Sequence, residues 1–247
     1  MRRYCFCLVV AAISLAPCIP AVATALDDYV NAPDPAYNWS LFATYPGAGY
    51  THYILHMDSQ TWLTASEVDR TVWEHEIVVT VPDTVSHDTA HLHIDGGSTT
   101  TVTTNNITEL TAMAVETESI VARLRQVPNQ PLTFVDGVPR TEDSLIAYGW
   151  DQFLRGGREE WLARFPMTKA AVRAMDAVSD FVATQFGGAL AVNSFVVSGA
   201  SKRGWTAWTT AAVDPRVVAV APMVIDLLNL NPSFTHHYAA LGYWAPA

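Results

Sequence analysis

The chain has 247 residues, a formal net charge of −10 and three cysteines; 15% of its residues are charged and 50% are hydrophobic. A composition this rich in apolar residues excludes a disordered chain, and an acidic chain without a Lys/Arg cluster excludes the usual nucleic-acid-binding surface. A membrane span after residue 25 is excluded as well. The next long apolar run, 217–225, has nine residues and contains Pro222, whereas a span takes about 20.

Residues 1–25 have the pattern of a secretory signal peptide. Two arginines precede an apolar run at 5–16, and the sequence A-V-A-T-A at 21–25 offers two overlapping A-x-A cleavage sites. All three cysteines lie in this segment, so the mature chain, residues 26–247, has none. We therefore expect a secreted, extracellular protein whose single domain is stabilised by an ordinary core and not by disulfides. An uncleaved N-terminal anchor is the alternative.

Strands dominate the first part of the mature chain. A short capped turn at 26–30 is followed by runs rich in Val, Ile, Thr, Tyr and His, which predict strands at 50–57, 74–81 and 89–94. After residue 107, helices are predicted at 108–116, 141–154, 168–186 and 202–212, and strands at 119–127, 194–197 and 217–224. This order predicts an α/β fold with a mostly parallel sheet, helices on both faces and a β-rich N-terminal part. We interpret the Pro-, Gly- and aromatic-rich segment 128–157 as an insertion over one face.

The segment 198–205, S-G-A-S-K-R-G-W, places Ser201 where a buried strand turns into a helix. A nucleophile at such a turn has an exposed hydroxyl on a strained backbone, and small neighbours such as Gly199 and Ala200 let strand and helix approach. The spacing is G-x-S-x-x-G and not the usual G-x-S-x-G, with Arg203 in place of the second glycine. We interpret Ser201 as a candidate nucleophile; the alternative is a serine that caps the helix.

Two groups are candidates for binding an oxyanion beside Ser201. The backbone N–H of Lys202 lies at the positive end of the predicted helix dipole. The loop after strand 89–94 contains Gly96 and Gly97, and flexible glycines can direct an N–H at a substrate oxygen, as the loop after this strand does in α/β-hydrolases. A plain tight turn is the alternative for these glycines.

The side chains of Lys202 and Arg203 are candidates for binding an acidic group of a substrate; the alternative is a pair of solvated charges. His91 and His93 share one face of a predicted strand, and an H-x-H pair can bind a metal. Without a third ligand nearby, we interpret them as buried or solvated strand histidines. Neither a metal nor a cofactor is therefore expected.

The residues after Ser201 offer one candidate acid and one pair of histidines. Asp226 follows the last predicted strand, where a triad acid can lie, although the usual place is one strand later. His236 and His237 fall within 232–243, a predicted loop or helix over the site, where a cap or a surface pair is the better interpretation than a general base. Because the predicted sheet is also short by about two strands, we interpret the chain as incomplete at its C-terminus.

The same segments carry a resemblance to a known family. The chain reads L-D-D-Y-V-N-A-P-D-P at 26–35 and Q-V-P-N-Q-P at 126–131, and S-G-A-S-K-R-G-W continues through A-A-V-D-P-R to A-P-M-V-I-D at 221–226. In these features it resembles the PhoPQ-activated pathogenicity-related family, which includes the autocrine proliferation repressor proteins of amoebae. The resemblance implies an α/β-hydrolase fold, Ser201 at the nucleophile position, secretion, and members that extend beyond residue 247. A second likeness, to glucuronoyl esterases, is limited to the basic Lys202 after the nucleophile.

Two functions fit these observations. The leading expectation is a secreted serine hydrolase that cleaves an ester or amide by acyl transfer through Ser201, with little turnover by this incomplete chain. The competing expectation is a non-catalytic secreted regulator that uses the hydrolase fold to bind a partner at the cell surface. The aromatic segment 148–161 could supply such a surface, although a buried core is the better interpretation for most tryptophans. A carbohydrate-binding domain that uses exposed aromatic residues is a third alternative. It does not explain the strand-to-helix turn at Ser201.

Overall fold

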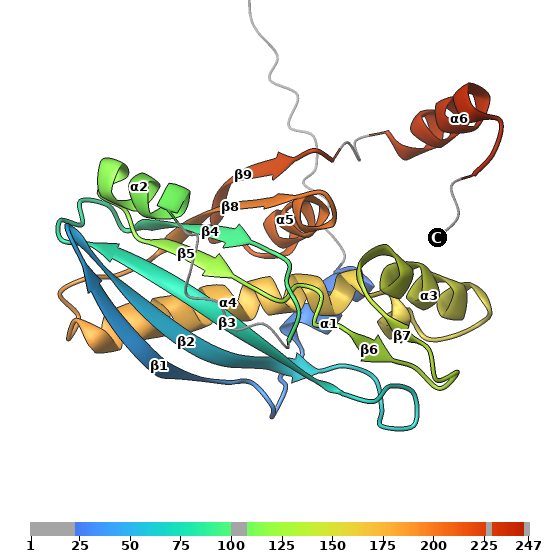
Figure 1. Ribbon diagram of the computed structural model, residues 1–247, viewed down its shortest axis with the longest axis horizontal. Coiled ribbons are helices and arrows are strands. Elements are labelled where there is room, and N and C mark those ends of the chain that lie inside the picture. The colour runs from blue at the N-terminus through green and yellow to red at the C-terminus, as the bar shows by residue number, and fades with distance from the viewer. Residues whose placement is uncertain (1–22, 100–107, 226–228, 245–247) are drawn as a thin grey trace, which may run out of the picture.

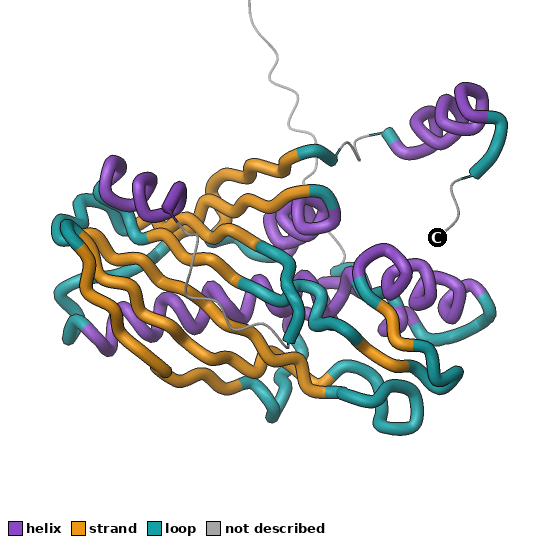
Figure 2. Tube along the Cα trace, in the orientation of Figure 1, coloured by secondary structure: helices purple, strands orange, loops and turns teal. Residues whose placement is uncertain are grey.

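The computed structural model describes residues 23–99, 108–225 and 229–244 (Figures 1 and 2). Residues 1–22, which include all three cysteines and most of the predicted signal peptide, lie outside the described part. The main sheet consists of β1 (Asn38–Gly47), β2 (Tyr50–Thr61), β3 (Val72–Pro82), β4 (Thr89–Ile94), β5 (Val121–Leu124), β8 (Ser194–Ala200) and β9 (Val217–Met223). The helices are α1 (Ala25–Asn31), α2 (Thr108–Thr117), α3 (Glu142–Leu154), α4 (Arg164–Gln185), α5 (Lys202–Val213) and α6 (Leu230–Leu241).

The strand order β1-β2-β3-β5-β4-β8-β9 divides the sheet into two halves. The strands β1, β2 and β3 are antiparallel neighbours, and β3 is also antiparallel to β5. From β5 onward, β5, β4, β8 and β9 are parallel neighbours joined by helical crossovers. Because β2 runs in the direction of this parallel group, only β1 and β3 are reversed within the described sheet. The predicted α/β-hydrolase-like fold with a β-rich N-terminal part is confirmed.

One strand of the main sheet, β1, was not predicted from the sequence. It pairs with β2 through a two-residue turn, with Gly47 opposite Tyr50 and Gly49 at a φ of +86°. That positive φ favours glycine, as is usual in tight hairpins. Pro46 makes the sequence around 38–45 look unlike a strand, because proline interrupts a central strand. It is tolerated in β1, because β1 lies at the edge of the sheet.

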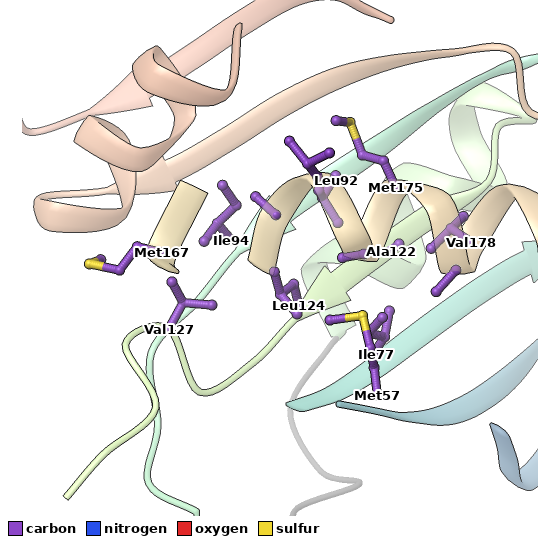
Figure 3. Packing of buried hydrophobic residues seen from close by; sticks show 14 of the residues in the cluster. Met57, Ile77, Leu92, Ile94, Ala122, Leu124, Val127, Met167, Met175 and Val178 are labelled. Carbon is purple, nitrogen blue, oxygen red and sulfur yellow. The ribbon is translucent and has the colours of Figure 1, made fainter. Parts of the chain in front are cut away.

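The long helix α4 supplies the core on one face of the sheet (Figure 1). It begins at Arg164, four residues before the predicted start at residue 168. This earlier start is possible because Pro166 falls in the first turn of the helix, where a proline is tolerated. Met175 and Val178 of α4 are fully buried, and Figure 3 shows them facing side chains of the sheet such as Leu92 and Ile77. The burial along α4 explains why its sequence pattern is easy to recognise.

Alternate residues of β4 face opposite sides of the sheet. Leu92 and Ile94 are buried in the core with α4, while His91 and His93 are half-buried on the other side, where His91 contacts Met113 of α2. The helices α4 and α2 therefore lie on opposite faces, as predicted. In the described part of the chain, no helix combines the length and the apolar character that crossing a bilayer requires.

The predicted insertion forms a second, two-stranded sheet and a helix. It contains the hairpin of β6 (Leu132–Thr133) and β7 (Pro139–Arg140), followed by α3 and a short 3₁₀ helix, η1 (Glu159–Trp161). Phe134 packs at 6.2 Å from Trp62 and at 6.0 Å from Trp161, measured between ring centroids. Both tryptophans are buried, whereas Trp150 is 41% exposed. The aromatic segment thus contributes mainly to the core.

The packing of β4 against α4 predicts a large loss of stability when Leu92 is truncated. Leu92 is fully buried, so we expect Leu92→Ala to lower the free energy of unfolding by about 2–5 kcal/mol. Leu154→Ala is the control, because Leu154 is 74% exposed; we expect a change below about 0.5 kcal/mol. Urea unfolding measures both values, and equal effects would show that β4 is not in the core.

The buried His75 and the half-buried His91 lead us to predict that the protein loses stability in mild acid. The His75 ring is completely buried between Ser59 Oγ and the Arg125 carbonyl, and burial lowers its pKa from 6.5 to about 4. Burial, and then His93, lowers the pKa of His91 to about 4 as well. Between pH 6.5 and 4 the unfolded chain therefore binds more protons than the folded chain, so stability falls as the pH falls.

We expect His75 alone to contribute about 3 kcal/mol to this loss. Thermal unfolding from pH 7 to pH 4 measures the effect. His75→Gln should flatten the dependence, and His87→Gln should preserve it, because His87 is exposed. A stability that does not change across this range contradicts the prediction.

Candidate functional site

Ser201 lies between the end of β8 and the start of α5, with a φ of 53° and a ψ of −121°. This backbone conformation is strained for a residue other than glycine and is typical of functional turns. Two backbone hydrogen bonds maintain it: Ser201 N–H donates to the Met223 carbonyl at 2.9 Å, and Trp205 N–H donates to the Ser201 carbonyl at 3.0 Å. The Ser201 side chain is exposed. We call residues 199–204 the elbow.

Close packing explains the two glycines of the elbow. A Cβ atom on Gly199 would lie 2.6 Å from the Arg203 carbonyl oxygen, and one on Gly204 would lie 2.6 Å from Ile225 Cγ2. Gly199 therefore lets β8 and α5 approach, and Gly204 lets α5 pack against Ile225, which follows β9. Ser201 occupies the N-cap position of α5, but its side chain makes no capping hydrogen bond. The alternative interpretation as a capping serine is wrong.

The loop after β4, residues 95–98, lies beside the elbow because β4 pairs with β8, with Ile94 opposite Gly199. We call it the β4 loop. Gly97 has a φ of +116°, which favours glycine. Gly96 N–H donates to Asp95 Oδ1 at 2.7 Å, and the Gly96 carbonyl accepts from Gln126 N–H at 2.9 Å. Because the Gly96 N–H has an acceptor, Gly97 is the better candidate of the two for an oxyanion donor.

The basic side chains of the elbow meet a carboxylate that sequence reasoning missed. Arg203 donates from Nη1 and Nη2 to the two carboxylate oxygens of Glu142 at 2.8 and 2.7 Å, and Lys202 Nζ lies 2.7 Å from Glu142 Oε2. Burial alone would raise the pKa of Glu142, but hydrogen bonds from Arg203, Lys202 and Gln130 hold this pKa at about 2. A substrate-binding role for Arg203 thus stays a prediction, and an acidic substrate group would compete with Glu142.

A second polar cluster, which sequence reasoning also missed, lies on the α2 side of β4 and β8. Ser198 Oγ is 2.7 Å from His91 Nε2 and 2.9 Å from His93 Nδ1. Burial lowers the pKa of both histidines, and the Ser198 hydroxyl donates to or accepts from each ring according to the tautomer of that ring. The parallel register, with His93 opposite Ser198, could have revealed the cluster.

These three side chains line a cavity of about 960 Å³ together with apolar residues of α2, β5, β8 and β9. Among the residues that line it, Ser201, Lys202 and Gly97 are absent, so the cavity and the elbow are separate features. Within the described ranges, no group of three or more His, Cys, Asp or Glu side chains is placed to hold a metal ion.

The predicted histidine pair is not brought to Ser201. Asp226 lies outside the described residues. His236 and His237 belong to α6, which stands apart from the sheet (Figures 1 and 2). His237 stacks on Trp244 with 5.8 Å between ring centroids. In the part of the chain that the structure covers, no hydrogen bond joins Ser201 Oγ to a histidine or carboxylate.

Comparison with known proteins gives a family match over most of the chain. Residues 26–247 match the family described as PhoPQ-activated pathogenicity-related protein. The chain is 44% identical over 228 residues to autocrine proliferation repressor protein A of Dictyostelium discoideum. This match covers 90% of the chain and 45% of the relative, so the chain spans about half the length of that protein.

Similar solved structures include two bacterial esterases. A putative acetyl xylan esterase from Bacteroides fragilis has a TM-score of 0.48 at 15% identity, over 79% of this chain and 50% of that chain. An acetyl xylan esterase from Paenibacillus sp. R4 also has a TM-score of 0.48, at 16% identity over 86% of this chain and 60% of that chain.

The packing of the elbow predicts that Gly199 cannot be replaced by alanine. The added Cβ would meet the Arg203 backbone, so we expect Gly199→Ala to lower the free energy of unfolding by about 3 kcal/mol or more. Gly187→Ala is the control, because Gly187 has a φ of +58° and open space around it. Its backbone strain costs about 1 kcal/mol. Urea unfolding distinguishes the two, and a Gly199→Ala variant as stable as the control contradicts the observed packing.

Proposed function

The chain belongs to the PhoPQ-activated pathogenicity-related family, and we propose that it is a secreted serine hydrolase acting through Ser201 on an ester or amide. One observation carries the proposal: Ser201 has a strained backbone at a strand-to-helix turn, an exposed side chain and no capping role. A helix start does not need this conformation, whereas a nucleophile that must be presented above a sheet does.

In the proposed reaction, Ser201 Oγ attacks the carbonyl carbon of the substrate and loses its proton to a general base. The oxyanion that forms is stabilised by the backbone N–H groups of Lys202 and Gly97 and by the positive end of the α5 dipole. Collapse of this intermediate expels the alcohol or amine, which takes up a proton, and leaves an acyl group on Ser201. Water then releases the acid and restores the serine.

The proposal needs a base and an acid as partners of Ser201. We propose Asp226 as the acid, because it comes three residues after β9 in the sequence. We propose that the base comes from chain beyond residue 247; the relative of about twice the length leaves room for it. Turnover by these 247 residues alone is accordingly expected to be low. Residues 1–25 are proposed as the signal peptide that directs secretion.

A fluorophosphonate probe tests the nucleophile directly. We expect slow formation of one covalent adduct, located on Ser201 by peptide mass spectrometry. Ser201→Ala should abolish the adduct, because the attacking oxygen is removed. Ser198→Ala is a matched control on β8, three residues before Ser201, and should label at the wild-type rate. An unlabelled wild-type protein, or an adduct that persists in Ser201→Ala, sinks the proposal.

The name of the Dictyostelium relative, a proliferation repressor, favours a second candidate function. This is a non-catalytic secreted regulator that uses the same fold to bind a partner at the cell surface. Adding purified wild-type and Ser201→Ala proteins to growing cells of the source organism separates the two candidates. A regulator keeps its effect on cell number after the substitution, whereas an effect that depends on hydrolysis is lost.

A further inference from the structure

We propose that Glu142 positions the β4 loop and the elbow relative to each other, acting through Arg203 and Gln130. The inference rests on the proposed role of Ser201, because it concerns the geometry around that residue. Glu142 is a positioning residue and not a catalytic one, since its carboxylate contacts other side chains and no reacting atom.

The Arg203 guanidinium joins three segments that are distant in sequence. It forms a bidentate pair with Glu142 at the start of α3, and its Nε donates to the Val127 carbonyl at 2.5 Å. It also lies against the β4 loop, where a Cβ atom on Gly96 would be 2.6 Å from Arg203 Nη2. A fork-to-fork pair fixes the orientation of the guanidinium plane as well as its position. Glu142 therefore fixes the orientation of the Arg203 guanidinium against the β4 loop.

Gln130 makes a second connection from Glu142 to the β4 loop. Its side-chain NH₂ donates to Glu142 Oε1 at 2.5 Å and to the Gly97 carbonyl at 3.3 Å, and its side-chain oxygen accepts from Glu142 N–H at 2.6 Å. Glu142 itself has a φ of +51°, a strained conformation that these contacts maintain. The Glu142 carboxylate thus contacts Arg203 of the elbow and also Gln130, whose side chain donates to the Gly97 carbonyl.

Charge explains why a carboxylate is needed at this position. Lys202 and Arg203 are nearly buried, with side chains 10% and 11% exposed, and both pair with Glu142. Arg164 adds a third cation, since its Nη1 donates to the Lys202 carbonyl at 2.7 Å. The other acidic partner, Asp143, is 82% exposed and 3.1 Å from Lys202 Nζ. Without the Glu142 charge, the cations of the elbow would repel one another.

Hydrogen exchange tests the geometric part in the complete 247-residue chain. We expect Glu142→Gln to speed amide exchange about tenfold in peptides covering 95–98 and 126–131, while exchange in α4 stays unchanged. Arg203→Lys, which keeps the charge but loses the fork, should act in the same direction. Asp151→Asn is the matched control on α3, since Asp151 pairs with Arg155 at the surface. Unchanged exchange at 95–98 in both Glu142→Gln and Arg203→Lys overturns the inference.

The rate of fluorophosphonate labelling supplies the functional readout. We expect Glu142→Gln to slow labelling of Ser201 about tenfold and Asp151→Asn to leave the rate unchanged; the Glu142→Gln/Arg203→Lys double variant should be no slower than the slower single variant. Faster exchange with unchanged labelling gives Glu142 a purely structural role and overturns the inference. A wild-type protein that never labels refutes the role of Ser201 instead, and the exchange data then decide the inference alone.

Discussion

The parallel pairing of β4 with β8 is the constraint on which the candidate site depends. With Ile94 opposite Gly199, the two strands end at the same level, so the β4 loop and the elbow leave the sheet side by side. A slip of β4 by one residue would exchange the buried Leu92 for the polar His93 on the α4 face. Burial of apolar side chains therefore fixes the place where the chemistry can occur.

The elbow could be predicted from the sequence because its determinants lie within a few consecutive residues. Gly199, Ser201 and Gly204 form one short motif, and the strand before them and the helix after them have clear apolar patterns. Glu142 could not be predicted in the same way. Its partner Arg203 is 61 residues away, and acidic residues in a first helical turn are common for reasons of the dipole alone.

The difference between local patterns and long-range contacts also explains which features of the fold the sequence did not predict. The strand β1 ends in Pro46-Gly47, which resembles a loop until its edge position is known. Ser198 resembles an ordinary strand residue until the register places it opposite His93. In each case the missing information is a contact between segments far apart in the chain, and local patterns of apolarity and turn residues do not contain it.

Electrostatics near the elbow differs from that of the chain as a whole. The protein has a net charge of −10, yet Lys202, Arg203 and Arg164 gather beside Ser201. Partly buried ion pairs of this kind are weak evidence for stability, because desolvation offsets much of the attraction. Lys202 and Arg203 both pair with Glu142, so an acidic group of a substrate would compete with that carboxylate.

The two serines at the end of β8 show why we assign the nucleophile to Ser201. Ser198 has two histidine neighbours, but it lies inside a strand paired on both sides, with β4 and β9. The backbone N–H groups there are used by the ladder, so none is available to an oxyanion. Ser201 has no such histidine in the described structure, but it precedes the first turn of α5, whose N–H groups have no intrahelical acceptor. Another segment of the chain can supply the general base. The backbone N–H donors beside the nucleophile must come from the turn that carries the serine itself.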